Sequence, residues 1–367
     1  MSSYPIITKK SAKSNDKIKK IQKEAKKKYG KRKLFGYPKA SIPKIIVESG
    51  YVDIVDKKVN TGVKINELNK LLLAIEENEL TGMSGNGFQT YKKLKTVMES
   101  VAQNKVLIIN GAECDPGLIH DAWLIRNRLK DIIFGSKLVA EMINASDVFL
   151  AAKLMKNESI EGINVKNLPN RYPIGAEKIL IKEVLGVEMD KKDIPVKKGI
   201  LVLNVQTIIM IAEIAKGQFL KGSRYITVAD YTNGEAKVAK VTYDMKSKEV
   251  LEKVLGNEAG KVIYAGGGIM GAHQIKGDER VTPLTNFVGY ADKVAYDNDS
   301  KCKKCGNCSR NCPMGIKVHK VVDDYGKGIN SNMQQYGVQN CINCGTCTYL
   351  CQAGKNTMEI VNMYSNK

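Results

Sequence analysis

Two blocks of cysteines near the C-terminus determine how this chain is interpreted. The first block is CKKCGNCSRNCP at residues 302–313, and the second is CINCGTCTYLC at residues 341–351. Each has the spacing Cys-x2-Cys-x2-Cys-x3-Cys, and together they hold eight of the nine cysteines. The spaced residues are Cys302, Cys305, Cys308 and Cys312 in the first block and Cys341, Cys344, Cys347 and Cys351 in the second. Identical spacing indicates two equivalent sites built from thiolates.

This spacing is typical of two 4Fe-4S clusters, in which three thiolates come from one loop and the fourth comes from the other block. We therefore predict one cluster on Cys302, Cys305, Cys308 and Cys351, and a second on Cys341, Cys344, Cys347 and Cys312. Zinc is the rival metal, because four cysteines also suit tetrahedral Zn²⁺. Zinc ribbons, however, pair two Cys-x2-Cys units and do not require a third cysteine in the same loop. A disulfide framework is typical of small secreted chains, and 367 residues is long for that class.

Length and composition indicate a globular protein of two or three domains. The chain has 367 residues, of which 43% are hydrophobic, enough for a buried core. It contains no run of about eighteen apolar residues, so no membrane-spanning helix is expected. Residues 1–10 lack the apolar core of a secretory signal. Because cluster-ligating thiols also need a reducing compartment, we expect a cytoplasmic protein.

The positive charge is concentrated at the N-terminus. The net charge is +20, and residues 1–40 carry fourteen Lys or Arg against Asp16 and Glu24. Such a run is most often a solvated arm, although an acidic partner or an anionic membrane surface could bind it. Nucleic acid is not an expected partner, because Arg32 is the only arginine in this arm and no nucleic-acid-binding module follows.

The residue pattern divides the remainder into four parts. After the arm, residues 41–64 have short β-branched runs and predict a small β segment. Residues 65–221 alternate helical periodicity with β-branched strands, the pattern of an α/β fold. Residues 222–290 read strand, strand, helix, strand, which suits a small β-grasp unit. Residues 291–367 carry the cysteine blocks.

Two polar loops stand out in the α/β part. Residues 82–88 form a glycine-rich turn before a predicted helix at 90–102, where backbone N–H groups could approach a phosphate. Residues 110–116 follow a predicted strand at 106–109, and polar residues at strand ends are where α/β sheets place ligand contacts. An ordinary turn around Asp115 is the simpler alternative.

These segments together resemble a known family. Residues 82–94, 110–116, 172–177, 204–207 and 266–271 and the cysteine blocks occur in the order seen in the C subunit of Rnf-type electron transport complexes. The soluble relatives of that subunit include the electron-transfer protein of proline reductase and the corrin reductase of microcompartments. The flavoprotein subunit of complex I is a more distant relative. The resemblance implies a complex I flavoprotein-like FMN domain at 65–221, an SLBB β-grasp domain at 222–290 and a dicluster ferredoxin domain. Residues 41–64 would then be a reduced N-terminal sandwich domain.

The resemblance also implies the residues of a flavin and nucleotide site. By family motif, the glycine-rich flavin loop is Gly82, Gly85 and Gly87, the aromatic beside the nicotinamide is Phe88, and the lysine near the flavin phosphate is Lys93. The polar set around flavin and nucleotide is Asn110, Glu113 and Asp115, and the remaining flavin wall is Tyr172, Gly175, Glu177, Asn204 and Thr207. Ser84 and Gln89 replace a glycine and a proline that the family usually has. A Cβ at Ser84 narrows the space for cofactor or nucleotide.

The function implied is a soluble NADH-dependent oxidoreductase. Electrons would pass from NADH through FMN and two 4Fe-4S clusters to a partner reductase, with proline reductase preferred and a corrinoid enzyme next. The alternatives are a flavin-less electron-relay subunit, which Ser84 and Gln89 motivate, and a peripheral subunit of an Rnf-type membrane complex. The three histidines, His120, His273 and His319, are each expected to be surface or packing residues.

Overall fold

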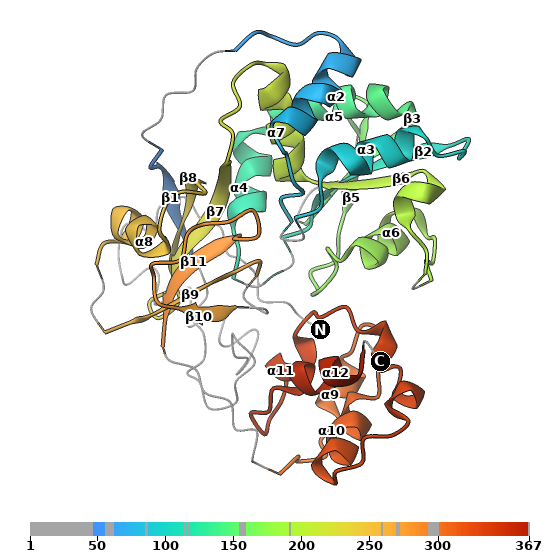
Figure 1. Cartoon of the computed structure of the whole chain (residues 1–367), viewed down its shortest axis with the longest axis vertical. Coiled ribbons are helices and arrows are strands. Elements are labelled where there is room, and N and C mark those ends of the chain that lie inside the picture. Colours follow the sequence, from blue (N-terminus) through green and yellow to red (C-terminus); the bar gives the residue numbers. More distant parts are fainter. Residues whose placement is uncertain are drawn as a thin grey trace.

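The computed structural model describes residues 47–55, 62–84, 87–113, 115, 117–153, 159–190, 192–257, 260–268, 272–292 and 301–365. The described chain forms an α/β unit, a second sheet with one helix, and a small helical unit that carries the cysteine blocks (Figure 1). The predicted basic arm, residues 1–40, lies outside the described residues, as do Gly85 and Cys114.

A five-stranded sheet forms the centre of the α/β unit. Its strand order is β4 (Ser159–Ile160), β5 (Ile163–Asn167), β3 (Ala145–Ala152), β2 (Lys105–Gly111) and β6 (Ile200–Asn204). The last four strands are parallel, and β4 runs antiparallel to β5. Because β2 and β6 pair in parallel with Asn110 opposite Asn204, two polar side chains meet at the carboxyl edge of the sheet.

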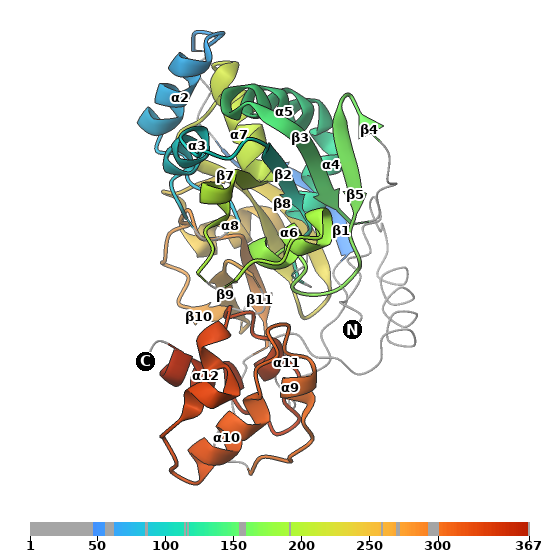
Figure 2. The same ribbon diagram turned by 90° about the vertical axis from the view of Figure 1, so that its right-hand side faces the viewer.

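Helices cover both faces of this sheet, as expected for strands with continuous apolar runs. One face packs against α2 (Leu68–Glu77), α3 (Thr90–Met98), α4 (His120–Asn127), α5 (Leu129–Ile143) and α7 (Val205–Ala215), and the other packs against α6 (Glu177–Leu185) (Figure 2). Successive strand side chains alternate between the faces, so Leu107 joins the first core and Ile108 the second. Every residue of α7 is buried.

The second sheet has the β-grasp arrangement that the sequence predicts. Its order is β1 (Val47–Asp53), β8 (Glu235–Thr242), β7 (Ser223–Asp230), β11 (Phe287–Ala291), β9 (Val262–Gly266) and β10 (His273–Ile275). The first and last strands of the grasp, β7 and β11, are parallel neighbours at its centre, and α8 (Ser247–Leu255) packs on one face. The segment 41–64 was expected to form its own β unit, but its described strand, β1, extends this sheet by pairing in parallel with β8.

The opposite face of the second sheet shares a core with the α/β unit. Tyr225 and Phe287 of this sheet belong to the same buried cluster as Leu107. On α7, the Gln206 amide accepts a hydrogen bond from the backbone N–H of Tyr225 and donates one to its carbonyl, at 2.5 and 3.1 Å. The buried contact and the paired hydrogen bonds fix the two units against each other.

The cysteine unit has its own small core. Its elements are α9 (Asn307–Arg310), α10 (Val318–Gly326), α11 (Thr346–Tyr349), α12 (Thr357–Ser365) and the 3-10 turns η4 (Met333–Tyr336) and η5 (Val338–Asn340); a further turn, η2 (Pro195–Lys198), precedes β6. Val321, Met333 and Val361 are buried together, with several cysteines packed against them. Both views place this unit, in red, at one end of the molecule (Figures 1 and 2). Among the described helices, none combines the length and the apolar character that crossing a bilayer requires.

Candidate functional site

A cavity of about 600 Å³ lies where the three units meet. This volume is in the range of small-molecule and cofactor sites. The α/β unit contributes most of the wall, including Lys93, Asn110 and Tyr172, while Gly267 and Gly268 come from the loop after β9. The cysteine unit closes the wall with Met314, Ile342, Asn343 and Cys344. The cavity therefore brings a cysteine of the second block to the carboxyl ends of the parallel strands.

Two asparagines at neighbouring strand ends order the centre of the site. The Asn110 amide donates to the Gly175 carbonyl at 2.9 Å and accepts from the Ala112 N–H at 3.1 Å, which holds the loop after β2. Asn204 caps α7 by accepting from the Gln206 N–H at 2.8 Å, and its amide donates to Asp121 Oδ2 at 2.7 Å. Each side chain is thus held by one bond to the backbone that follows it and by a second bond to a distant segment.

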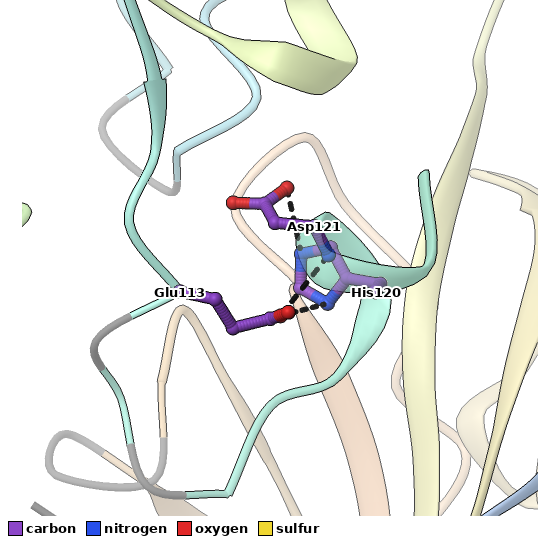
Figure 3. A group of neighbouring side chains, drawn as sticks. All are labelled: Glu113, His120 and Asp121. Carbon is purple, nitrogen blue, oxygen red and sulfur yellow. Dashed lines mark hydrogen bonds and ion pairs between the residues drawn. The ribbon is translucent and has the colours of Figure 1, made fainter. Parts of the chain in front are cut away.

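Glu113, His120 and Asp121 form a buried polar cluster in the cavity wall (Figure 3). Glu113 has φ +33° and accepts from the Asp121 and Ala122 N–H groups at the start of α4, at 3.1 and 2.6 Å. His120 lies between the carboxylates, with Nδ1 3.7 Å from Glu113 Oε1 and Nε2 3.8 Å from Asp121 Oδ1. Its Nδ1 also lies 3.0 Å from the Thr227 hydroxyl, so the second sheet positions this ring.

Burial controls the protonation of this cluster. It raises the pKa of Glu113, with the Asp121 carboxylate adding to the effect, and it raises the pKa of Asp121. Burial, together with a smaller effect of the Arg224 guanidinium, lowers the pKa of His120 to about 3. At neutral pH the histidine is therefore neutral, and the carboxyl pair tends to retain a proton. The ligand atoms of the three residues lie within 4.8 Å of one another, a spacing that could also hold a metal ion.

Lys93 and Glu177 form an ion pair in the same wall. Lys93 Nζ lies 2.6 Å from Glu177 Oε1 and donates to the Val202 carbonyl at 2.8 Å. The pair joins α3 to the start of α6, and it places an ammonium group at the cavity surface. Lys178, the next residue of α6, also lines the cavity. The wall therefore contains two lysines, of which Lys93 is paired with Glu177 and Lys178 donates to the Asp190 carbonyl at 2.5 Å.

Eight of the thirteen predicted flavin and nucleotide residues line this cavity: Lys93, Asn110, Glu113, Asp115, Tyr172, Gly175, Glu177 and Asn204. Gly82, Gly87 and Phe88 do not line it, and the Phe88 side chain is exposed. Thr207 lies behind the wall, where its hydroxyl accepts from the Met83 N–H at 3.0 Å. Gly85 falls outside the described residues.

Sequence reasoning missed His120 and Asp121 as residues of the site. His120 was expected to be a surface or packing residue. It is buried, as a packing residue would be, and it also lines the cavity. Asp121 received no role, and the structure places it in the first turn of α4. Only the pairing of β2 with β6 brings Asp121 to Asn204.

The eight block cysteines fall into two groups. One small cavity is lined by Cys302, Cys305, Cys308 and Cys351, and another by Cys312, Cys341, Cys344 and Cys347. Burial raises the pKa of Cys308 to about 11 and of Cys347 to about 12. Because burial disfavours the bare thiolates, these groups suit a bound cationic metal centre, which stabilises the deprotonated form.

The side chains of these cavities fit the clusters and the flavin that the sequence predicts. Each cysteine cavity presents four sulfur atoms, the ligand chemistry of iron-sulfur and zinc sites. His319 also lines the cavity of the first set, where its Nδ1 lies 2.7 Å from the Ser309 hydroxyl. In the larger cavity, Asp121 Oδ1 is buried and has no hydrogen-bond partner among the described residues. A buried acceptor without a hydrogen-bond partner favours a ligand that can donate to it. A flavin with its ribityl chain is rich in such N–H and O–H groups.

Comparisons with known proteins identify two domains. Residues 75–213 match the Nuo51 FMN-binding domain, and residues 294–352 match the 4Fe-4S dicluster domain. The predictions of FMN and of two 4Fe-4S clusters are confirmed at this level, as is the predicted fold class. The chain therefore carries a region similar to a flavin-binding domain, followed by a region similar to a dicluster iron-sulfur domain.

The predicted resemblance to C subunits of Rnf-type complexes is also confirmed. The chain is 25% identical over 295 residues to the C subunit of the Na⁺-translocating ferredoxin:NAD⁺ oxidoreductase complex of Acetobacterium woodii. It is 27% identical over 291 residues to the C subunit of the proton-translocating ferredoxin:NAD⁺ oxidoreductase complex of Clostridium ljungdahlii. These alignments cover 76% and 74% of the chain, but only 66% and 62% of the relatives. The chain thus spans less than two thirds of the length of these relatives.

Solved structures share the fold at low sequence identity. A chain of an NAD⁺-reducing [NiFe]-hydrogenase in the H₂-reduced state superposes with a TM-score of 0.59 at 15% identity, covering 81% of this chain and 61% of that one. The air-oxidised form gives 0.56, again at 15% identity, and covers 80% of this chain and 63% of that one. At this identity the likeness supports the fold alone.

Proposed function

We propose that this chain is an FMN and iron-sulfur oxidoreductase that takes electrons from NADH and delivers them to a protein partner. Bound FMN accepts two electrons together and releases them singly, and 4Fe-4S clusters carry single electrons. The observation that carries the proposal is the shared wall of the large cavity, which Cys344 lines together with the polar residues of the α/β unit. A flavin in this cavity would lie beside the second cysteine set.

The side chains of the cavity divide into three roles. Lys93 and Lys178 would hold the flavin phosphate, because they are the lysines that line the cavity in the described part of the chain. Asn110, Asn204 and Asp121 would bind the polar edge and ribityl hydroxyls of the flavin. Asp115, on the loop after β2, would contact the nicotinamide nucleotide. Its Oδ1 accepts from the Gly117 N–H at 3.2 Å, which orients the carboxylate.

The two cysteine groups would hold the clusters with exchanged fourth ligands. One cluster takes Cys302, Cys305, Cys308 and Cys351, and the other takes Cys312, Cys341, Cys344 and Cys347. The support is that each set of four lines its own small cavity. The predicted domain boundaries, at residues 40, 64, 221 and 290, remain part of this proposal, as does the cytoplasmic location.

A second candidate is a peripheral subunit of an Rnf-type membrane complex. The curated relatives carry the names of subunits of ion-translocating ferredoxin:NAD⁺ oxidoreductase complexes, which favours this role. A soluble protein that serves proline reductase or a corrinoid enzyme is the alternative that we prefer. Co-purification with membrane proteins under gentle conditions would favour the subunit, whereas isolation from a detergent-free extract with NADH activity would favour the soluble form.

Replacement of Asp115 by Asn tests the nucleotide role. Asparagine keeps the acceptor for the Gly117 N–H but removes the charge, so we expect a KM for NADH raised about tenfold, with unchanged reduction of the clusters by dithionite. Asp147→Asn, an exposed change near the start of β3, is the matched control. Unchanged NADH kinetics in the Asp115 variant would overturn the assignment of this residue to the nucleotide.

A further inference from the structure

The two cysteine loops have the same spacing but opposite electrostatic character. Residues 301–312 contain Lys301, Lys303, Lys304 and Arg310 and no acidic residue. Residues 341–351 contain no charged residue at all. Since the ligand spacing does not require this difference, the surroundings of each loop must account for it.

The uncharged loop lines the large cavity. Cys344 lines the large cavity, together with Ile342 and Asn343. The Tyr172 hydroxyl of the α/β unit donates to the Cys344 carbonyl at 2.7 Å. A loop that closes a cofactor cavity in its own chain gains nothing from cationic side chains, because desolvating them would be costly.

The basic loop presents its charges to solvent. Lys301, Lys303, Lys304 and Arg310 are all exposed. Lys304 lies 3.9 Å from the Asp323 carboxylate, a weak pair, whereas Lys301 and Lys303 form no ion pair with any carboxylate in the part of the chain that the structure describes. Lys303 and Lys355 also line the small cavity of the first cysteine set. Cationic side chains therefore lie beside a predicted redox centre.

We propose that this basic loop, defined as residues 301–310 with Lys355, is a docking surface for a small acidic electron-carrier protein. The inference rests on the proposed function and adds the chemical class of its partner. Complementary charge steers association and sets the orientation of the partner, which a carrier must have to approach the first cysteine set closely. A large positive net charge elsewhere on the chain would attract acidic proteins without directing them to this loop.

An anionic membrane fits this surface less well than a protein does. Membrane-binding surfaces combine cations with exposed large apolar side chains that enter the lipid. Residues 301–312 have no exposed large hydrophobic residue. The charges also lie on a compact cysteine loop, and α9, the only helix of this loop, has four residues. The observations thus favour a protein partner.

The test measures binding directly, without electron transfer. The probe is ¹⁵N-labelled zinc-substituted rubredoxin, a small acidic carrier that is redox-inert in this form, titrated with the full-length protein carrying its cofactors. We expect a Kd that weakens at least about tenfold between low and physiological salt. The double variant Lys301→Glu/Lys303→Glu should weaken binding at low salt by about tenfold or more, because both charges are reversed at the interface.

A matched double variant controls for net charge. Lys192 and Lys197 are exposed in the segment of the α/β unit that precedes β6, and Lys192→Glu/Lys197→Glu changes the net charge by the same amount. This variant should bind rubredoxin within about twofold of the wild type. Equal weakening by the two double variants would overturn the proposal, because binding would then follow total charge. Tight binding of the wild type to phosphatidylserine vesicles with none to rubredoxin would also overturn it.

Iron and flavin analysis of the same preparations separates this inference from the proposed function. If the cofactor content is complete but the Lys301→Glu/Lys303→Glu variant binds rubredoxin as tightly as the wild type, only the docking surface is rejected. Missing clusters or flavin reject the proposed function, whatever the binding data show. Both double variants should match the iron content and visible spectrum of the wild type, which establishes that the substitutions leave the cysteine unit folded.

Discussion

Tyr172 and Cys344, 172 residues apart in the sequence, are joined by a hydrogen bond from the tyrosine hydroxyl to the cysteine carbonyl at 2.7 Å. The bond connects the loop before α6 to the second cysteine loop, and both residues line the large cavity. The cavity wall and the cysteine unit are thus held together at the point where the proposed flavin and the proposed second cluster approach each other.

Removal of this hydrogen bond should loosen the second cysteine loop. Tyr172→Phe deletes a hydroxyl that contributes about 1 kcal/mol, so we expect amide exchange in residues 341–347 to accelerate several-fold while iron content is retained. Hydrogen-exchange mass spectrometry measures this change. Tyr325→Phe, an exposed change on α10, is the control. Equal protection of the loop in the Tyr172 variant and the wild type would contradict the structural role of this bond.

Replacement of Gly268 by Ala should disturb the part of the cavity wall that the second sheet contributes. The added Cβ would collide with the Asp115 carboxylate, which also lines the cavity and would have to shift. We expect Gly268→Ala to lower the FMN content and raise the KM for NADH several-fold, with the clusters unaffected. Gly326→Ala is the matched control, because its Cβ would meet no atom within 4 Å. Normal FMN content and NADH kinetics in Gly268→Ala would show that the loop tolerates the shift.

Pairs of cysteine substitutions test the exchange of fourth ligands. If Cys302 and Cys351 hold the same cluster, Cys302→Ala/Cys351→Ala should retain about four of the eight irons that two clusters contain. Cys302→Ala/Cys312→Ala should disrupt both clusters and leave few irons. Iron analysis with EPR of the dithionite-reduced variants measures the outcome. If the pattern is reversed, each block holds its own cluster and the proposed pairing is wrong.

The buried carboxyl pair predicts a pH dependence of stability. Burial raises the folded-state pKa of Glu113, so the folded protein binds that proton more tightly than the unfolded chain does. The stability from this group is complete below its ordinary pKa and is lost as the pH rises. His120, with its pKa lowered to about 3, has the opposite effect, which is confined to pH values below the ordinary histidine pKa of about 6.5.

Above about pH 7 the pH dependence therefore comes from the buried carboxyl pair without a contribution from His120, and a substitution of Glu113 measures the share of that residue. We expect the Tm of the wild type to fall from about pH 7 to about pH 9, and Glu113→Gln to reduce this slope, because glutamine does not titrate. Thermal unfolding of both proteins under anaerobic conditions measures the slopes. Glu141→Gln, an exposed change on α5, should leave the slope unaltered. An identical slope in the Glu113 variant would assign the pH dependence to other groups.

The sequence predicted the elements more completely than it predicted their assembly. The α/β pattern, the strand, strand, helix, strand order of the second sheet and the two cysteine blocks all follow from local periodicity and spacing, and the structure contains them. The placement of β1 beside β8 did not follow, because parallel pairing between segments about 190 residues apart leaves no local signal.

The same division applies to the candidate site. Asn110, Glu113 and Asp115 could be proposed from one loop after one strand. Asp121 enters the site through its hydrogen bond to Asn204, and His120 through its contact with Thr227 of the second sheet. Both contacts depend on the packing of distant segments. Phe88 illustrates the converse, since a family motif assigned it to the site, whereas its side chain is exposed and does not line the cavity.

The most direct test of the central claim is anaerobic purification with quantitation of FMN and iron, followed by addition of NADH in a UV-visible spectrometer. We predict about one FMN and about eight irons per chain, with NADH bleaching the flavin absorbance first and the cluster absorbance next. Eight irons without flavin, or a spectrum that NADH leaves unchanged, would contradict the claim. The chain would then be a cluster-bearing relay that receives its electrons from a partner.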